Sequence, residues 1–418
     1  MKKKDIFEND LNKFSREDLS GLASNKASSI NDAIVIKEIN KACKRLAKNP
    51  SLFSGDPDRI FTYDDPILAL AAYFENNAEA FGGDIAAAGV SGEDLQRASW
   101  WPWAKTAIHA WLSRGDQSFV ILGGRTPTET IKFDKDRLRL AVVGDGGYKG
   151  VAQENVLRMI TTRHQEVPFD LLIHLGDTYF AASAAEMLRN FLSPFMATGL
   201  RVLTLLGNHD LYFGAEPFND ALNILAQPGR YFCIENNYWR IACLDSALAS
   251  ERILRHQGLL DEGQLKWLYR LISDSGQRNV VIMSHHPIVS GWSAGSLSLK
   301  AQLRHALKAG RVVSCYWGHE HMCATYEKSS CGFYGACVGN GAFNEIWTRP
   351  SQRPRPSWYA KGRCECYGKR SPFWPHGYLE LDLRQDAILE TYHLENGRER
   401  TRRLRRQSRT FAEAHADQ

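Results

Sequence analysis

Six side chains that can bind metal ions stand in five short polar clusters of the sequence. They are two aspartates, one asparagine and three histidines, namely Asp145, Asp177, Asn208, His285, His319 and His321. This mixture of oxygen and nitrogen donors suits Mn, Zn, Fe or Co, and it is too rich in nitrogen for Ca or Mg alone. Six donors exceed the needs of one ion. A carboxylate that bridges two ions about 3.5–4 Å apart would divide them sensibly.

Each cluster directly follows an apolar run that has the length of a buried strand. The five runs lie at 138–143, 169–175, 201–206, 279–284 and 311–317. Helical patterns separate several of them, at 153–164, 184–196, 261–275 and 299–310. Buried strands that alternate with helices predict an α/β layered domain. Because functional groups gather at the carboxyl ends of strands in such sheets, we expect the five clusters to form one site.

The ordered clusters GDGG, GDTYF, GNHD, SHHP and GHEH resemble the calcineurin-like metallophosphoesterases. The glycine form of the first cluster is similar to the purple acid phosphatase branch. The resemblance covers about residues 136–395. It implies two mixed sheets flanked by helices, a four-layer αββα sandwich, with a dinuclear metal centre between the loops of the sheets.

The resemblance also implies roles for individual residues. It assigns the ligands to two ions that share one carboxylate: Asp145 and His321 on the first ion, Asp177 between both, and Asn208, His285 and His319 on the second. His209 would face the phosphate and protonate the leaving oxygen, with Asp210 orienting it. Hydroxide held by the ions would attack phosphorus, because bound cations depress the pKa of water.

Two positions depart from the family pattern around the first ion. Gly147 stands where most of the superfamily has a histidine. Purple acid phosphatases compensate with a tyrosine three residues after the bridging aspartate, but here that place holds Phe180 and the tyrosine comes one residue early, as Tyr179. Adjacent residues usually point apart, so we expect Tyr179 to miss the site. The resulting predictions are weak occupancy by the first ion and no tyrosinate-to-iron colour.

Beyond the clusters, the chain divides into three parts. Residues 1–135 have helical patterns and a short apolar run at 118–124, residues 136–395 form the metallophosphoesterase domain, and 396–418 are an Arg-rich, mobile tail. The alternation over 377–397, with a polar turn near Gln385, predicts a hairpin. His174 is expected in the core and His305 on the surface. His286 either lines the pocket or packs beneath Pro287.

Two basic segments stand out from the overall charge of +5. Residues 349–372 carry seven Lys or Arg against one Glu, and 396–418 carry seven Arg against three acidic residues. The first segment interleaves arginines with aromatic residues such as Trp358 and Tyr359. It could stack and neutralise a nucleic acid strand, but we favour a solvated loop that frames an anionic pocket.

The composition of the chain bears on its cellular compartment and on the state of its cysteines. No apolar segment follows the basic residues at the N-terminus, and no window approaches the ~18 apolar residues of a membrane span. Nine cysteines, an odd number, suit reduced thiols. We therefore predict a cytoplasmic protein without membrane contact. Six cysteines crowd 315–366, but they lack a Cys-x-x-Cys pair, so the spacing does not favour structural zinc.

The function predicted from these observations is hydrolysis of a phosphoester, monoester or diester, by a dinuclear centre of Mn, Zn or Fe. Two alternatives stay open. The first keeps the chemistry but directs it at nucleic acid or a nucleotide, recruited by the basic segments. The second is a binding or scaffold protein whose weakened first site no longer turns over.

Overall fold

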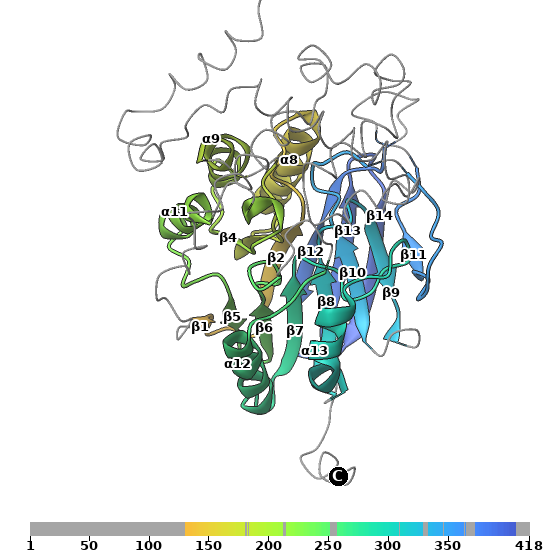
Figure 1. Cartoon of the computed structure of the whole chain (residues 1–418). Helices are drawn as coiled ribbons and strands as arrows, with labels where there is room; N and C mark the ends of the chain where they lie inside the picture. Colours follow the sequence, from red (N-terminus) through yellow and green to blue (C-terminus); the bar gives the residue numbers. More distant parts are fainter. Residues whose placement is uncertain are drawn as a thin grey trace, which may run out of the picture.

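Two β-sheets lie face to face between two groups of helices in the computed structural model (Figure 1). The structure describes residues 130–179, 182, 184–211, 215–250, 257–308, 310–328, 333–345, 347–362, 364 and 373–406. The helical patterns of residues 1–129 and the strand predicted at 118–124 therefore lie outside the described residues.

One sheet has eight strands. In spatial order they are β1 (Thr130–Lys132), β5 (Phe232–Glu235), β6 (Trp239–Cys243), β7 (Asn279–Ser284), β8 (Val312–Trp317), β10 (Tyr334–Val338), β9 (Cys323–Tyr326) and β11 (Trp358–Tyr359). The run β6–β7–β8–β10 is parallel, whereas β9 pairs antiparallel with β10 and β11. The sheet is therefore mixed, as the resemblance implied.

The other sheet has six strands. Their order is β14 (Glu399–Arg405), β13 (Ala387–Leu394), β12 (Gly377–Leu383), β2 (Leu138–Val143), β3 (Leu171–His174) and β4 (Val202–Thr204). The three strands β2, β3 and β4 run parallel, so their carboxyl ends meet at one edge. The predicted hairpin over 377–397 is confirmed as the antiparallel pair β12–β13.

Helices cover the outer faces of both sheets. The six-stranded sheet carries α8 (Val151–Glu166), α9 (Ala184–Glu186), the π-helix η4 (Met187–Leu192), α10 (Ser193–Met196) and α11 (Glu216–Ile224). The eight-stranded sheet carries α12 (Glu262–Ser273) and α13 (Leu297–Lys308). Asp261 caps α12 by accepting a hydrogen bond from the Gln264 amide, 2.8 Å away. The predicted four-layer sandwich is confirmed.

Strand β2 shows how the layers are held together. Side chains alternate between the two faces of a strand. Leu140 and Val142 belong to the large apolar core between the sheets, whereas Ala141 and Val143 belong to the core beneath α8 and η4. All four are fully buried, because β2 lies inside the sandwich. This explains why its sequence reads as a continuous apolar run.

Both predicted domain boundaries need correction. Strand β1 lies inside the segment 1–135 and pairs in parallel with β5, so the sheets begin before residue 136. The predicted tail at 396–418 is partly ordered, because β14 pairs along its whole length with β13. Its Arg402 is buried and donates to both carboxylate oxygens of Glu390, at 2.7 and 3.1 Å. Residues 407–418 lie outside those described.

Helix length and polarity bear on the membrane question. Among the residues described, no helix is both long enough and apolar enough to cross a bilayer. Two predictions for individual histidines are confirmed. His174 is buried in β3, and His305 is exposed on α13.

Candidate metal centre

The five polar clusters meet where strands from both sheets end. Asp145, Asp177 and Asn208 follow the parallel strands β2, β3 and β4 of the six-stranded sheet. His285 follows β7 and the pair His319 and His321 follows β8, neighbouring strands of the eight-stranded sheet. Each sheet thus supplies half of the donors, and the structure brings all six predicted ligands together.

The backbone at three of these positions is strained. Asp145, Asp177 and His319 have φ angles of 56°, 71° and 67°. This left-handed region is unusual for residues with a side chain, and such strain gathers at functional sites. The strain falls where the chain leaves β2, β3 and β8, at the strand ends where the candidate ligands meet.

A glycine beside the centre allows a close approach of two loops. A Cβ atom on Gly207 would lie 2.1 Å from Asp177 Oδ1 and 2.6 Å from the Asp177 amide nitrogen. No side chain fits there. The loop after β4 can therefore bring Asn208 next to Asp177 only because residue 207 is glycine.

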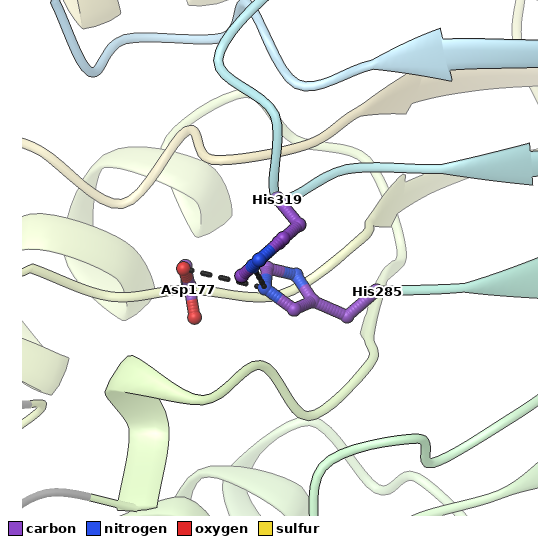
Figure 2. Close-up of side chains that lie close together, drawn as sticks. All are labelled: Asp177, His285 and His319. Atoms are coloured by element: carbon purple, nitrogen blue, oxygen red, sulfur yellow. Dashed lines mark hydrogen bonds and ion pairs between the residues drawn. The ribbon is translucent and has the colours of Figure 1, made fainter. Parts of the chain in front are cut away.

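Four donors define the candidate second-ion group, and Figure 2 shows Asp177, His285 and His319 of this group. His285 Nε2 lies 3.2 Å from His319 Nδ1 and 3.3 Å from Asp177 Oδ2. Asn208 Oδ1 lies 3.1 Å from the first of these nitrogens and 3.0 Å from the second. Donors about 2.0–2.2 Å from a common ion are spaced in this way. The four residues therefore fit a single metal ion.

The ring of His285 is held in one orientation. Its Nδ1 lies 2.9 Å from the carbonyl oxygen of Leu175, which cannot donate a hydrogen bond. The Nδ1–H group therefore donates to that oxygen, and Nε2, 3.3 Å from Asp177 Oδ2, is the nitrogen that would bind a metal ion. Histidines that ligate metals are commonly fixed by such a bond on the far side of the ring.

Three residues define the candidate first-ion group: Asp145, Asp177 and His321, whose donor atoms lie within 4.8 Å of one another. His321 Nε2 lies 3.4 Å from Asp145 Oδ1. Asp177 belongs both to this group and to the second-ion group. Its carboxylate thus occupies the position that a ligand shared by two ions requires.

Tyr179 points into the first-ion group, contrary to the prediction from its spacing. Its hydroxyl lies 2.7 Å from Asp145 Oδ1, 2.8 Å from His321 Nε2 and 3.1 Å from Asp177 Oδ2. The expectation failed because the chain after Asp177 is a turn rather than a strand, so the alternation of adjacent side chains does not apply. Phe180 lies outside the described residues.

The structure explains why residue 147 is a glycine. It forms an isolated bridge with Thr178, and the Tyr179 amide donates to its carbonyl oxygen at 2.9 Å. A Cβ atom on Gly147 would lie 2.6 Å from the Asp177 carbonyl oxygen. The close approach that aims Tyr179 at the centre thus excludes a histidine at residue 147.

The two predicted catalytic residues have different surroundings. His209 is half-buried, and its ring centroid lies 4.6 Å from that of Tyr179. Asp210 is buried, and its carboxylate accepts hydrogen bonds from three backbone amides, those of Asp177, Thr178 and Gly207, at 2.8–3.0 Å. These bonds tie the loops after β3 and β4 together. Asp210 thus fixes the backbone next to His209, and its predicted role in orienting His209 stays a prediction.

The centre attracts positive charge. Burial lowers the pKa of His285, but the negative charge of Asp177 outweighs this effect and raises it to about 9. In the same way, hydrogen bonds to Asp145 and Glu345 overcome burial and raise the pKa of His321 to about 10. Burial and the nearby Asp177 carboxylate raise the pKa of Asp210 to about 7. Without metal, protons on the imidazoles balance the carboxylates, and metal ions would displace them.

Several neighbours of the centre carry no readable sequence signal. The Phe343 ring lies 4.3 Å from that of Tyr179 and 4.6 Å from that of His321, and it also contacts Tyr148. Glu345 lies 3.5 Å from His321 Nδ1. These side chains come from the loop after β10, which no polar motif marks. Its amides at 342 and 343 donate to the Asp145 carbonyl oxygen.

His286 is buried beside the centre, and its Nδ1 lies 2.9 Å from the hydroxyl of Ser246. Its ring lies 4.8 Å from that of His319. It therefore packs against His319, a candidate ligand, on the buried side of the centre.

Comparisons with known proteins concern the family and the fold. The family model of calcineurin-like phosphoesterases matches residues 138–323. A comparison with curated proteins finds no match. Among solved structures, GAP50, the anchor in the inner membrane complex of Plasmodium, is 15% identical with a TM-score of 0.53, covering 66% of this chain and 91% of its own. A dimetal phosphatase from Danio rerio is 15% identical with a TM-score of 0.48, covering 65% and 99%. The matched residues 138–323 contain all five motifs and all six candidate ligands, so this part of the chain is similar to the calcineurin-like phosphoesterases.

Proposed function

We propose that this protein hydrolyses phosphoesters with two metal ions that share Asp177. The observation that carries the proposal is the position of the Asp177 carboxylate, which belongs to both candidate ligand groups. Asn208, His285 and His319 would hold one ion. Asp145, His321 and Tyr179 would hold the other. When bound, the ions would supply a hydroxide nucleophile near neutral pH and neutralise the charge of the phosphoryl group.

The residues of the chain have separate tasks in this proposal. Asp210 fixes the loops that carry Asp177 and Asn208, through its three bonds to backbone amides. His209 would give a proton to the leaving oxygen, a step typical of a half-exposed imidazole. Its amide donates to Asp177 Oδ1 at 2.9 Å, which couples its position to that of the shared carboxylate.

The metal identities follow from the donors. Tyrosine and carboxylate oxygens around the first ion favour a hard cation, with ferric iron the best fit, and Mn is the alternative. Two imidazoles, an amide oxygen and a carboxylate suit Zn, Mn or Fe at the second position.

The basic segment after the centre supports an anionic substrate. Residues 349–362 follow Glu345, which contacts His321. Arg353, Arg355 and Lys361 are exposed on it. A nucleic acid target is the weaker candidate, because the half-buried Tyr359 ring already packs against Trp292 and lies under Lys361. The substrate class we propose is therefore a small phosphoester.

The test replaces Asp177 by alanine in the full-length protein and measures hydrolysis of aryl phosphate mono- and diesters with Mn, Zn, Co and Fe. We expect D177A and N208A to abolish hydrolysis of the better substrate, with an unchanged circular dichroism spectrum. H305A, which changes an exposed histidine on α13, is the matched control and should retain full activity. Activity retained in D177A would refute the shared-ligand proposal.

The same activity measurement on the wild-type protein distinguishes a hydrolase from a non-catalytic scaffold. The structural neighbour GAP50 is described as an anchor, and a weakened first site was the reason to consider such a role here. The Tyr179 hydroxyl at the first-ion group removes that reason. Wild-type protein that binds at most one ion at this centre and hydrolyses neither ester would revive the scaffold.

A further inference from the structure

A second group of metal-binding side chains lies outside the dinuclear centre. It consists of Cys364, His376 and Glu395, whose donor atoms all lie within 4.8 Å of one another. Cys364 and His376 are each 1% exposed, and Glu395 is half-buried. A thiol, an imidazole and a carboxylate in one cluster are donors that zinc prefers.

The group is assembled by the sheet. His376 precedes β12 and Glu395 follows β13, and the first residue pair of that hairpin is Gly377 with Leu394. The Glu395 amide donates to the His376 carbonyl oxygen at 2.8 Å, and the His376 amide donates to Glu395 Oε1 at 3.1 Å. Cys364 is brought in by its amide, which donates to the Phe373 carbonyl oxygen at 3.0 Å.

The ring of His376 is oriented as in a metal ligand. Its Nδ1 lies 3.3 Å from the Asn340 carbonyl oxygen, so this nitrogen carries the proton and donates. Nε2 then carries the lone pair, as Nε2 of His285 would once a metal ion displaced its proton. Burial lowers the pKa of His376, which keeps the ring neutral as a ligand must be.

A fourth donor is at hand. Asn344 Oδ1 lies 3.1 Å from His376 Nε2, the same spacing that Asn208 shows to His285. Ligands of a tetrahedral zinc ion at about 2.0–2.3 Å lie about 3.3–3.8 Å apart. Small rotations of the Cys364 and Glu395 side chains would close the group to that spacing.

We propose that Cys364, His376, Glu395 and Asn344 form a structural zinc site separate from the dinuclear centre. The absence of a Cys-x-x-Cys pair argued against structural zinc in the sequence, but here the ligands come from three separate segments, and only one of them is a cysteine. Short-range cysteine spacing cannot signal such a site.

The proposed ion would stabilise the dinuclear centre by linking three segments of the chain near it. It would join the end of the basic segment, through Cys364, to the hairpin β12–β13. It would also join both to the loop 339–345, whose amides at 342 and 343 hold the Asp145 carbonyl oxygen. Loss of zinc is therefore expected to lower the melting temperature and to loosen the loop beneath Asp145.

Cobalt replacement tests the site without relying on activity. Cobalt bound to a thiolate gives a near-ultraviolet sulfur-to-cobalt band, and the ligands proposed for the dinuclear centre contain no sulfur. We expect this band in the cobalt-loaded wild type and in D177A. It should vanish in C364A, and zinc analysis of C364A should show one equivalent per chain fewer. C243A, which changes another buried cysteine in β6, is the matched control and should keep both.

A second variant covers the case in which C364A does not fold. E395Q keeps the oxygen that accepts the His376 amide but loses the negative charge, and we expect zinc affinity to fall at least about 10-fold. A cobalt-loaded wild type without the sulfur band would overturn the proposal, and so would a band that persists in C364A. Because D177A should keep the band, failure of this site is distinguishable from failure of the proposed hydrolase.

Discussion

The hydroxyl of Tyr179 lies 2.7 Å from Asp145 Oδ1, although the two residues are 34 positions apart and follow different strands. The contact exists because the loops after β2 and β3 bridge at Gly147 and Thr178. It supplies the first-ion group with a donor that the histidine pattern of the superfamily would otherwise provide.

Tyr179 is therefore expected to ligate the first ion. Iron-loaded protein should absorb visible light through tyrosinate-to-iron charge transfer, and Y179F should lose this band and bind the first ion at least about 10-fold more weakly. Absorption spectra and iron analysis of both proteins test this. Y148F, which changes a neighbouring tyrosine, should retain the colour. A colourless iron-loaded wild type would contradict the assignment.

Gly147 is expected to tolerate no side chain. In G147A the new Cβ would lie 2.6 Å from the Asp177 carbonyl oxygen, so the shared ligand must move. We expect a loss of about 1–3 kcal/mol in the free energy of unfolding. A displacement near 1 Å would also lower kcat roughly 100-fold. Urea titrations and ester hydrolysis measure the two effects.

The matched control for this change is Gly150→Ala, three residues further on. A Cβ atom there meets nothing within 4 Å, and the φ angle of 172° is extended backbone that alanine adopts. G150A should therefore leave stability and kcat nearly unchanged. Equal effects of G147A and G150A would show that the bridge to Thr178 does not position Asp177.

Much of the centre could be predicted from sequence because its ligands follow buried parallel strands. The apolar runs fix β2, β3, β4, β7 and β8, and a glycine directly before the first ligand of four of the five clusters marks the turn. Tyr179 could not be placed, because its direction depends on the turn geometry after Asp177. Phe343 and Glu345 lie in a loop held by bonds to the Asp145 backbone, and such long-range bonds leave no periodic signal.

The fold shows the same limit at its edges. Strands β5, β9 and β11 are short and carry no polar cluster, so only their pairing partners define them. The Arg-rich segment reads as a solvated tail by composition. It forms β14, in which Arg402 donates a hydrogen bond to Glu390 on the neighbouring strand β13. Glu390 is 12 residues away, so the local sequence does not reveal this partner.

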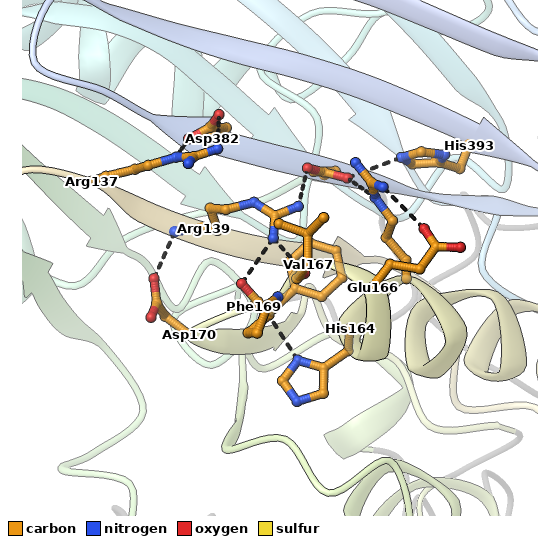
Figure 3. A network of polar contacts seen from close by, with 12 residues as sticks. Arg137, Arg139, His164, Glu166, Val167, Phe169, Asp170, Asp382 and His393 are labelled. Carbon is orange, nitrogen blue, oxygen red and sulfur yellow. Dashed lines mark hydrogen bonds and ion pairs between the residues drawn. The ribbon is translucent and has the colours of Figure 1, made fainter.

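A buried ion-pair network between β2, α8 and β12 is expected to make stability depend on pH (Figure 3). Arg139 donates to Glu380 and to the carbonyl oxygens of Val167 and Pro168, so it ties the end of α8 to the sheet. Arg163 also donates to Glu380, at 3.0 Å. Burial raises the pKa of Glu380, but the hydrogen bonds from His393, Arg139 and Arg163 outweigh it and lower the pKa to about 2.

The sign of the pH effect follows from that shift. A carboxylate whose pKa is lower in the folded state stabilises the protein above its unfolded pKa, and this contribution is lost as pH falls through the folded value. We expect the free energy of unfolding to decrease between about pH 5 and pH 2.

E380Q should unfold about 2–4 kcal/mol more easily at pH 7 and show a flatter pH profile, because it leaves Arg139 without its charged partner. E262Q, which removes an exposed pair with Lys266, should retain the wild-type profile. Denaturant titrations from pH 2 to 7 compare the three proteins, and an E380Q profile as steep as the wild type would assign the acid sensitivity to other carboxylates.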